Sequence, residues 1–233
     1  MRRRTLLVAA ASVLAGSATS ARVATAAAPV ALELFTSQGC SSCPPADRLL
    51  GELASDPAVV ALAWHVDYWN GLGWADPFAS AQATARQRAY ADRLGTEVYT
   101  PALVVGGATM VVGSDRGAVA AAIRTAPEAP VAVSLRLDGG ALVAEIGAAG
   151  RRVGGVLAFY DPEHDTAVAH GENGGRRLRE YRIVRQAMAL EPWDGSARRL
   201  EVAAPAAGQG AVVLVQDADL RVVGIAELRP TRV

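Results

Sequence analysis

The chain has 233 residues, a formal net charge of zero and a hydrophobic fraction of 51%. That length corresponds to one or two domains, and so apolar a composition excludes a natively disordered chain. Two cysteines are present, and they stand three positions apart in the sequence.

The first 26 residues have the pattern of a secretory signal peptide. Residues 2–4 are arginines, residues 5–16 are apolar but too few to span a bilayer, and Ala24 and Ala26 fit a cleavage site of small residues. We therefore expect a periplasmic or secreted mature protein, with a retained anchor as the alternative. The Arg3–Arg4 pair also matches a twin-arginine export signal weakly.

Cleavage would change the charge of the protein. It removes four arginines and leaves an excess of about four acidic residues. Nucleic-acid binding requires a basic surface, so we expect no nucleic-acid partner. We expect no membrane span in the mature chain, because none of its apolar runs is both long and uncharged.

Residues 29–127 alternate between strand-like and helix-like patterns. Strands are expected at 30–36, 59–66, 102–105 and 109–112. Three helices are expected. The first follows Cys43, and the second begins at Asp76 and Pro77 and ends at Gly95. The third is capped by Ser114 or Asp115 and ends at Pro127. This order, β-α-β-α-β-β-α, indicates a small α/β sheet with a parallel pair and an antiparallel hairpin.

Residues 129–231 have a different pattern of short strands and turns. About six strands are expected, at 131–137, 142–146, 156–160, 178–188, 211–216 and 222–228. Asp138, Gly139 and Gly140 form a clear hairpin turn between the first two. We therefore expect an all-β C-terminal module that resembles a small sandwich.

Cys40 and Cys43 form a Cys-x-x-Cys pair directly after a buried strand and at the start of a helix. Unpaired N–H groups and the positive end of the helix dipole stabilise a thiolate at that place. Cys43 lies one turn further on and can attack a mixed disulfide formed at Cys40. The pattern predicts Cys40 as the nucleophile and Cys43 as the resolving thiol.

Three other interpretations of the pair stay open. The first is a structural disulfide, although so short a loop contributes only about 2 kcal/mol. The second is a metal site, in which His65 joins the two thiols or copper binds to them. The third is chance spacing.

The Cys40-Ser41-Ser42-Cys43 motif and the Tyr99-Thr100-Pro101 segment before the next strand resemble the thioredoxin superfamily. Pro101 matches the position of that superfamily's cis-proline, and an ordinary trans proline is the alternative. The resemblance implies that Thr100 and Pro101 position the partner peptide. It also implies a buried acid near the resolving cysteine, for which Glu33 is the candidate, with a solvent-exposed or salt-bridged glutamate as the alternative.

A closer resemblance is to a family of exported bacterial proteins filed as a domain of unknown function. It rests on the segments ELFTSQGCSSCPPAD at 33–47, WHVDYW at 64–69 and VYTP at 98–101, and on GEN at 171–173. It covers almost the whole mature chain and implies a thioredoxin-like fold with a β-rich extension. Between the cysteines stand two serines, which leave the direction of the redox reaction open.

Aromatic and polar side chains gather after the second strand. Trp64, His65, Tyr68 and Trp69 follow it in sequence and are candidates for a substrate-facing rim, or else for packing under a long loop. Taken together, the sequence predicts a thiol–disulfide oxidoreductase that acts on exported proteins or small disulfides and needs no bound cofactor. A copper-handling protein and a non-catalytic binding module are the alternatives.

Overall fold

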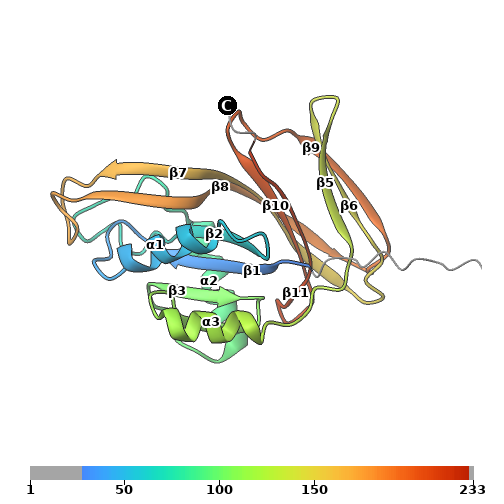
Figure 1. Cartoon of the computed structure of the whole chain (residues 1–233), viewed down its shortest axis with the longest axis horizontal. Coiled ribbons are helices and arrows are strands. Elements are labelled where there is room, and N and C mark those ends of the chain that lie inside the picture. Colours follow the sequence, from blue (N-terminus) through green and yellow to red (C-terminus); the bar gives the residue numbers. More distant parts are fainter. Residues whose placement is uncertain (1–27, 231–233) are drawn as a thin grey trace, which may run out of the picture.

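The computed structural model describes residues 28–230, so the predicted signal peptide lies outside the described residues. Over that range the protein is a mixed α/β structure made mostly of strands, with three helices and one large sheet (Figure 1). None of the helices in this range is long and apolar enough to cross a membrane.

The first half of the chain alternates strands and helices. Its elements are β1 (Val30–Thr36), α1 (Pro44–Leu53), β2 (Val59–His65), α2 (Ala81–Leu94), β3 (Ala102–Val105), β4 (Thr109–Val112) and α3 (Arg116–Arg124). β1 pairs with β2 in parallel, and α1 connects the two strands. β3 pairs antiparallel with both β1 and β4. All seven residues of β2 are buried, as its nearly continuous apolar run predicts.

The second half consists of strands. They are β5 (Val133–Asp138), β6 (Ala141–Ile146), β7 (Val153–Ala167), β8 (Arg177–Trp193), β9 (Arg198–Ala203), β10 (Gly210–Gln216) and β11 (Val222–Leu228). Four of them extend the sheet of the first half, whose order is β11-β10-β7-β8-β2-β1-β3-β4. β5, β6 and β9 form a second, three-stranded sheet.

The sheet is therefore continuous across the expected junction between an α/β half and an all-β half. β8 joins β2 in parallel where Ala63 pairs with Ile183. Next to this pair Arg182 adopts a left-handed backbone conformation, and its Nε donates to the carbonyl of Ala61 at 3.0 Å. The sequence pattern shows that the later residues form strands, but pairing between strands so far apart is not visible in it.

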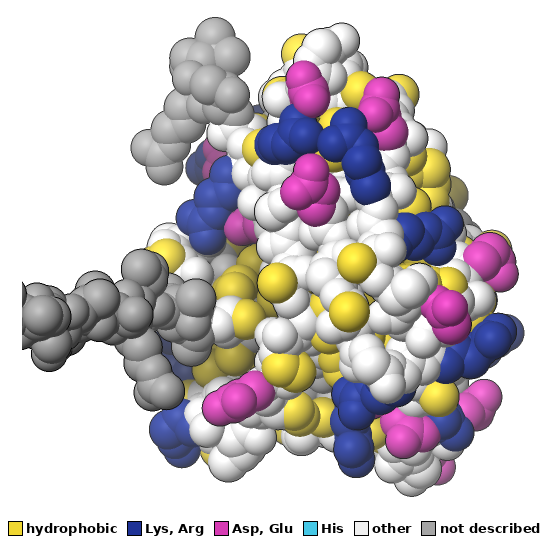
Figure 2. Space-filling view, turned by 90° about the vertical axis from the view of Figure 1, so that its right-hand side faces the viewer, with side chains coloured by type: hydrophobic (Ala, Val, Ile, Leu, Met, Phe, Trp, Pro, Cys, Tyr) yellow, Lys and Arg dark blue, Asp and Glu magenta, His cyan; other side chains and the backbone are white. Residues whose placement is uncertain are grey.

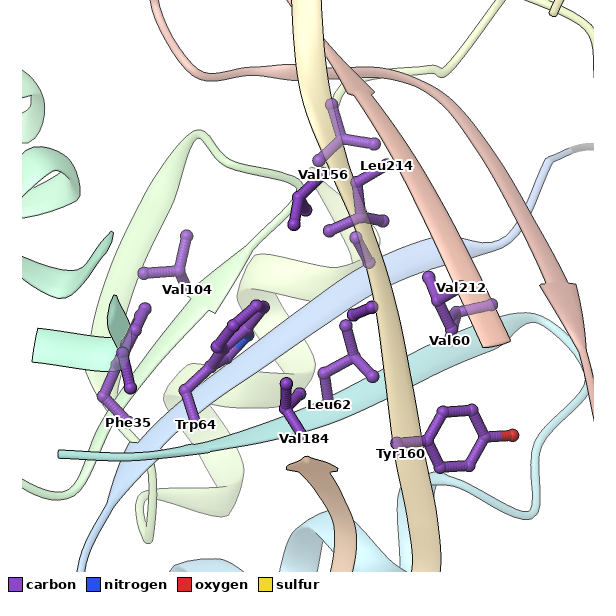
Figure 3. Packing of buried hydrophobic residues seen from close by; sticks show 14 of the residues in the cluster. Phe35, Val60, Leu62, Trp64, Val104, Val156, Tyr160, Val184, Val212 and Leu214 are labelled. Atoms are coloured by element: carbon purple, nitrogen blue, oxygen red, sulfur yellow. The ribbon is translucent and has the colours of Figure 1, made fainter. Parts of the chain in front are cut away.

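Two apolar clusters lie on opposite faces of the first-half strands. One contains Phe35 and Trp64 of the first half, Tyr90 of α2 and residues of the second half such as Val156 and Leu214. Figure 3 shows Phe35, Trp64, Val156 and Leu214 within this cluster. The other contains Leu34, Leu50 and further residues of α1 and α3. Because successive strand residues point to opposite faces, neighbouring residues of β1 serve different clusters. That alternation decides which side chains of β1 can reach α1.

The three-stranded sheet packs against the second-half part of the large sheet. Leu142, Ala144 and Ile146 of β6 share an apolar cluster with Leu157 and Val213. This two-layer arrangement is the sandwich-like feature that the turn pattern predicts, built on the large sheet rather than beside it. On the face shown in Figure 2, basic and acidic side chains are interspersed and form no patch of one sign.

The helix ends are partly as expected. Gly95 ends α2 in the left-handed conformation, and Asp115 caps α3 by accepting a hydrogen bond from the N–H of Ala118. The prediction that α2 begins at Asp76 and Pro77 is wrong, because α2 begins at Ala81 with Ser80 as its N-cap. The Asp76 carboxylate is used elsewhere, as described below.

Two strands are longer than predicted and one was missed. β7 has 15 residues and β8 has 17, because their hairpin continues past the buried part of the sheet. The far end of β7 is mostly exposed and carries cross-strand ion pairs such as Arg179–Glu163 at 2.7 Å. β9, with the sequence RRLEVA, alternates between half-buried and exposed residues, and its Leu200 and Val202 pack against the apolar cluster.

Candidate functional site

Cys40 and Cys43 form a disulfide at the N-terminus of α1, with their Cα atoms 5.4 Å apart. Cys43 is the N-cap of the helix, and Pro44 and Pro45 occupy its first positions. The helix thus begins at Pro44, although another proline follows. Both cysteines are buried, each with a relative exposure of 0%.

The backbone around the disulfide is tightly turned. The Cys40 N–H donates to the Ser37 carbonyl at 3.1 Å, and the Cys43 N–H donates to the Cys40 carbonyl at 3.2 Å. Pro44 and Pro45 have no N–H to offer to a thiolate. The Ser42 hydroxyl lies 3.3 Å from the Cys40 sulfur and is therefore a hydrogen-bonding group close to this atom.

The Thr100–Pro101 peptide bond is cis, which confirms the expectation for Pro101. Trp69 links this segment to the cysteine loop, because its indole N–H donates to Thr100 Oγ1 at 2.9 Å. A methyl group placed on Gly39 would lie 3.1 Å from the Cβ of Trp69. Trp69 is therefore held between the residue before Cys40 and the residue before Pro101.

Tyr68 belongs to the same region and is 37% exposed. Its hydroxyl donates to Gln87 at 3.1 Å, and the Gln87 amide donates to the carbonyl of Tyr99 at 2.6 Å. The structure thus brings Tyr68, Trp69 and Thr100 together beside the cis-proline, and their role as a substrate-facing rim stays a prediction.

Trp64 is not part of that rim. It is 2% exposed and belongs to the apolar cluster on the α2 side (Figure 3). The Arg86 guanidinium lies 5.1 Å from the centre of its ring. The substrate-binding expectation for Trp64 is therefore wrong. Trp64 belongs to a strand that is covered on both faces, and it lines a small hollow beside Pro77 and Phe78 rather than the edge at Tyr68 and Thr100.

His65 is also buried, at 1% exposure, and so cannot line a substrate-facing surface. Its Nδ1 lies 2.7 Å from Oδ2 of Asp76, and its ring packs edge-on against Phe78. Asp76 also accepts from the N–H of Gln38 at 2.8 Å. His65 and Asp76 therefore anchor the loop that leads into Cys40.

The His65–Asp76 pair belongs to a larger group of buried ionisable side chains that includes Asp47 and Glu180. Burial raises the pKa of Asp47 to about 7, and the charge of His65 works in the opposite direction. Burial opposes protonation of His65, but Asp76, Glu180 and Asp47 raise the pKa of its imidazole above the ordinary value. Asp47 thus titrates close to neutral pH, four residues after Cys43 on the same helix.

Three buried side-chain atoms have no hydrogen-bond partner within the described residues. Thr36 Oγ1 and His65 Nε2 belong to this region, and Trp64 Nε1 lies on the α2 side of the sheet. An unpaired buried polar group costs free energy and calls for an explanation. Together with Asp47, Thr36 and His65 make the region between β1, β2 and α1 more polar than packing alone requires.

Glu33 does not fit the role that the resemblance implies. Its carboxylate accepts from Arg86 at 2.5 and 2.9 Å and from the Tyr90 hydroxyl at 2.5 Å, and both partners are on α2. α1 packs on the other face of the sheet. Glu33 is therefore a buried, salt-bridged glutamate on the face away from Cys43, and the acid on the side of Cys43 is Asp47.

Several residues at the site were not predicted as site residues, although they lie in the segments that carry the family resemblance. Gln38 donates from its side chain to Glu180 and to Thr166, both at 2.9 Å, and accepts from the Trp74 indole at 2.9 Å. The segment between β7 and β8 adds Glu172 and Asn173, which bind the backbone around Cys40. The resemblance over 171–173 was the one sign that this segment matters.

The described residues form no set of side chains that could serve as the ligands of a metal ion. Within residues 28–230 no group of three or more His, Cys, Asp or Glu side chains is arranged to hold a metal ion. His65 faces Asp76, so the trio of Cys40, Cys43 and His65 is not assembled.

Comparison with known families identifies the chain. Residues 31–216 match the family described as "Protein of unknown function (DUF1223)". The chain belongs to this family. The DUF1223 match includes the cysteine pair, the cis-proline segment and the segment between β7 and β8.

Solved structures that resemble this DUF1223 protein include the following two. Protein AGR_C_4864 from Agrobacterium tumefaciens is 33% identical, with a TM-score of 0.77 over 90% of this chain and 98% of that one. HBP35 of Porphyromonas gingivalis is 14% identical, with a TM-score of 0.60 over 90% of this chain and 79% of that one, and therefore shares the fold alone. No curated protein matches the sequence.

Proposed function

We propose that this DUF1223 protein is an exported thiol–disulfide oxidoreductase with a thioredoxin-like core, acting through Cys40 and Cys43. The observation that carries the proposal is the placing of the disulfide. It stands at the N-terminus of α1 directly after a buried strand, and Trp69 connects its loop to the cis-Pro101 segment. The order β1-α1-β2-α2-β3-β4-α3 supports the thioredoxin-like assignment.

The reaction exchanges one disulfide for another. In the reduced protein the Cys40 thiolate attacks a sulfur of the partner's disulfide, and one partner thiolate leaves and takes up a proton. The Cys43 thiol then loses its proton and attacks Cys40. The partner's second sulfur leaves as a thiolate, so the partner gains two electrons and the Cys40–Cys43 pair loses two. The same steps in reverse oxidise a partner dithiol.

Asp47 is the proton acceptor that we assign to Cys43. Its backbone N–H donates to the Cys43 carbonyl at 3.1 Å, and residues four apart lie on the same face of a helix. A carboxyl group with a pKa of about 7 can both accept and return a proton at neutral pH. Asp47 replaces Glu33 in this role because Glu33 faces α2.

The partners are thiols or disulfides of other exported proteins, or small disulfides. This follows from the signal-like leader in the sequence, since exported compartments permit disulfide chemistry. Thr100 at the cis-proline edge, with Tyr68 and Trp69 beside it, is the surface against which we expect the partner's backbone to lie.

A redox titration of the mature protein against glutathione or dithiothreitol buffers tests the proposal. A potential between about −120 and −270 mV, the range of known oxidoreductases, supports it. A value well below about −300 mV indicates an inert structural bridge and overturns it. Cys43→Ser should trap a mixed disulfide at Cys40 with a model disulfide substrate, and Cys40→Ser should trap none.

A further inference from the structure

The segment that connects β7 to β8, residues 168–176, here called the cover segment, is hydrogen-bonded to the loop that carries Cys40. The segment has its own internal bonds. The Gly175 N–H donates to the Val168 carbonyl at 2.8 Å, and Arg176 donates from Nη1 to Asn173 Oδ1 at 2.7 Å. Its shape is thus set independently of the cysteine loop, and Asn173 is held in place within it.

Two adjacent side chains join the cover segment to the cysteine loop. The Asn173 side-chain amide donates to the carbonyls of Gln38 and Cys40, both at 2.9 Å, and Asn173 itself is fully buried. Glu172 Oε2 accepts from the N–H of Ser41 at 3.0 Å. Between residues 168–176 and residues 37–43, both wholly described, there is no backbone–backbone hydrogen bond. The cover segment can therefore leave the cysteine loop without breaking any strand pairing.

Exchange requires an incoming sulfur to approach in line with the bond it breaks, and a cysteine with 0% exposure does not offer that approach. Some part of the surroundings has to move before reaction, and the cover segment is bound to the cysteine loop by side chains alone. The charge of Glu172 indicates when such movement is favourable. Hydrogen bonding to Ser41 lowers the pKa of this carboxyl group, so it is ionised at neutral pH next to Cys40.

We propose that the cover segment is a redox-responsive gate that Glu172 and Asn173 hold closed over the oxidised pair and that opens when Cys40 becomes a thiolate. This inference rests on the proposed function and adds a regulation of the same site. A dithiol reductant supplies two electrons and two protons, is itself oxidised to a disulfide, and leaves thiols at Cys40 and Cys43. Loss of the Cys40 proton then adds a negative charge on the residue next to Ser41, whose N–H is already bound to the Glu172 carboxylate, and like charges repel.

The gate predicts that contacts remote from the sulfur atoms limit the rate of their reduction. The rate of reduction by dithiothreitol is measured by alkylation and mass shift on the oxidised mature protein. Asn173→Ala and Glu172→Ala should each be reduced about tenfold faster than wild type. Glu172→Gln keeps an acceptor for the Ser41 N–H, so it should be within about threefold of wild type. Glu128→Gln, which alters an exposed carboxylate elsewhere, is the matched control and should not change the rate.

Reduction at the wild-type rate in both alanine variants overturns the gate. This result is distinct from failure of the proposed function, because dithiothreitol reduces the pair whatever its biological potential. If Asn173→Ala does not fold, the reduction rate of Glu172→Ala alone tests the gate, because Glu172 is exposed and its substitution should not disturb folding.

A second measurement tests opening on reduction. Exchange of the Ser41 amide proton, followed by NMR, should be slow in the oxidised protein and at least tenfold faster in the reduced protein. Reduced Glu172→Gln should keep the slow exchange, because the repulsion between charges is gone. Equal exchange in oxidised and reduced wild type refutes the redox response even when the proposed function stands.

Discussion

Gln38 and Glu180 are 142 positions apart in the chain, yet the side-chain amide of Gln38 donates a hydrogen bond to Oε2 of Glu180 at 2.9 Å. The same glutamine binds Asp76 through its backbone N–H and Trp74 through its side-chain carbonyl. The loop before Cys40 is thus fixed by β8 and by the segment after β2. The β-rich second half is therefore part of the candidate site.

Asp47→Asn should stabilise the oxidised protein above neutral pH and leave it unchanged in acid. The carboxyl pKa is about 7 in the folded protein against an ordinary value of 3.8, so the folded state binds this proton more tightly. The contribution of the protonated Asp47 carboxyl group to the free energy of unfolding is fully present below about pH 3.8. It is lost as the pH rises through about 7. At pH 8 we expect the variant to gain about 2 to 4 kcal/mol in unfolding free energy.

Urea unfolding at pH 3.5 and pH 8 provides that measurement for Asp47→Asn. Asp92→Asn, which replaces an exposed aspartate on the next helix, is the control and should follow wild type at both pH values. Equal stabilities of Asp47→Asn and wild type at pH 8 would show that the carboxyl group is not held in an unfavourable buried environment.

Glu33→Gln should destabilise the protein without changing its redox behaviour. The substitution leaves the Arg86 guanidinium, which is 15% exposed, without its carboxylate partner. Removing one member of a buried ion pair costs about 3 to 5 kcal/mol. The Cys40–Cys43 potential should equal that of wild type, because Glu33 faces α2. A shift of the potential by more than about 30 mV, or about tenfold in equilibrium constant, would restore Glu33 as the relay.

The sequence predicted most of what the local pattern of residues controls. The strand before Cys40, the helix after Cys43, the cap at Asp115 and the cis bond at Pro101 are all as expected. Each depends on residues within a few positions, such as a capping side chain or a run of apolar residues that marks a buried strand.

The errors have a common physical origin in contacts between distant parts of the chain. Asp76 looks like a helix cap because Pro77 follows it, but tertiary contacts with His65 and Gln38 take its carboxylate. Glu33 and Asp47 are both acids near the cysteines in sequence. Which of them lies on the side of Cys43 depends on the face of β1 that α1 covers. Local spacing does not encode which face of β1 receives α1.

Ser42→Ala should raise the pKa of the Cys40 thiol in the reduced protein. The serine hydroxyl lies 3.3 Å from the sulfur, and the two prolines that follow Cys43 offer no N–H groups. A hydrogen bond to a charged group contributes about 1.5 to 3 kcal/mol, so its loss should raise the pKa by about one unit or more. The rate of alkylation by iodoacetamide as a function of pH measures it. Ser114→Ala, at an exposed serine outside the site, should leave the curve unchanged.

Gly51→Ala should destabilise the protein although alanine is the better helix former. Gly51 is in α1, and a methyl group built on it would lie 2.5 Å from the ring of Tyr181 on β8. Overpacking at such a contact costs about 1 to 3 kcal/mol, which exceeds the helix-propensity gain of about 1 kcal/mol.

Gly117→Ala, in α3, is the matched control for Gly51→Ala, because its new methyl group would meet nothing closer than Asp115 Oδ1 at 3.4 Å. It should show the propensity gain alone, so the two alanine variants should change the unfolding free energy in opposite directions. Gly51 is at the contact between α1 and β8. Gly51→Ala should therefore also weaken the packing of the second half against the helix that has Cys43 as its N-cap. Stabilisation by Gly51→Ala in urea unfolding would mean that α1 and β8 are not in close contact.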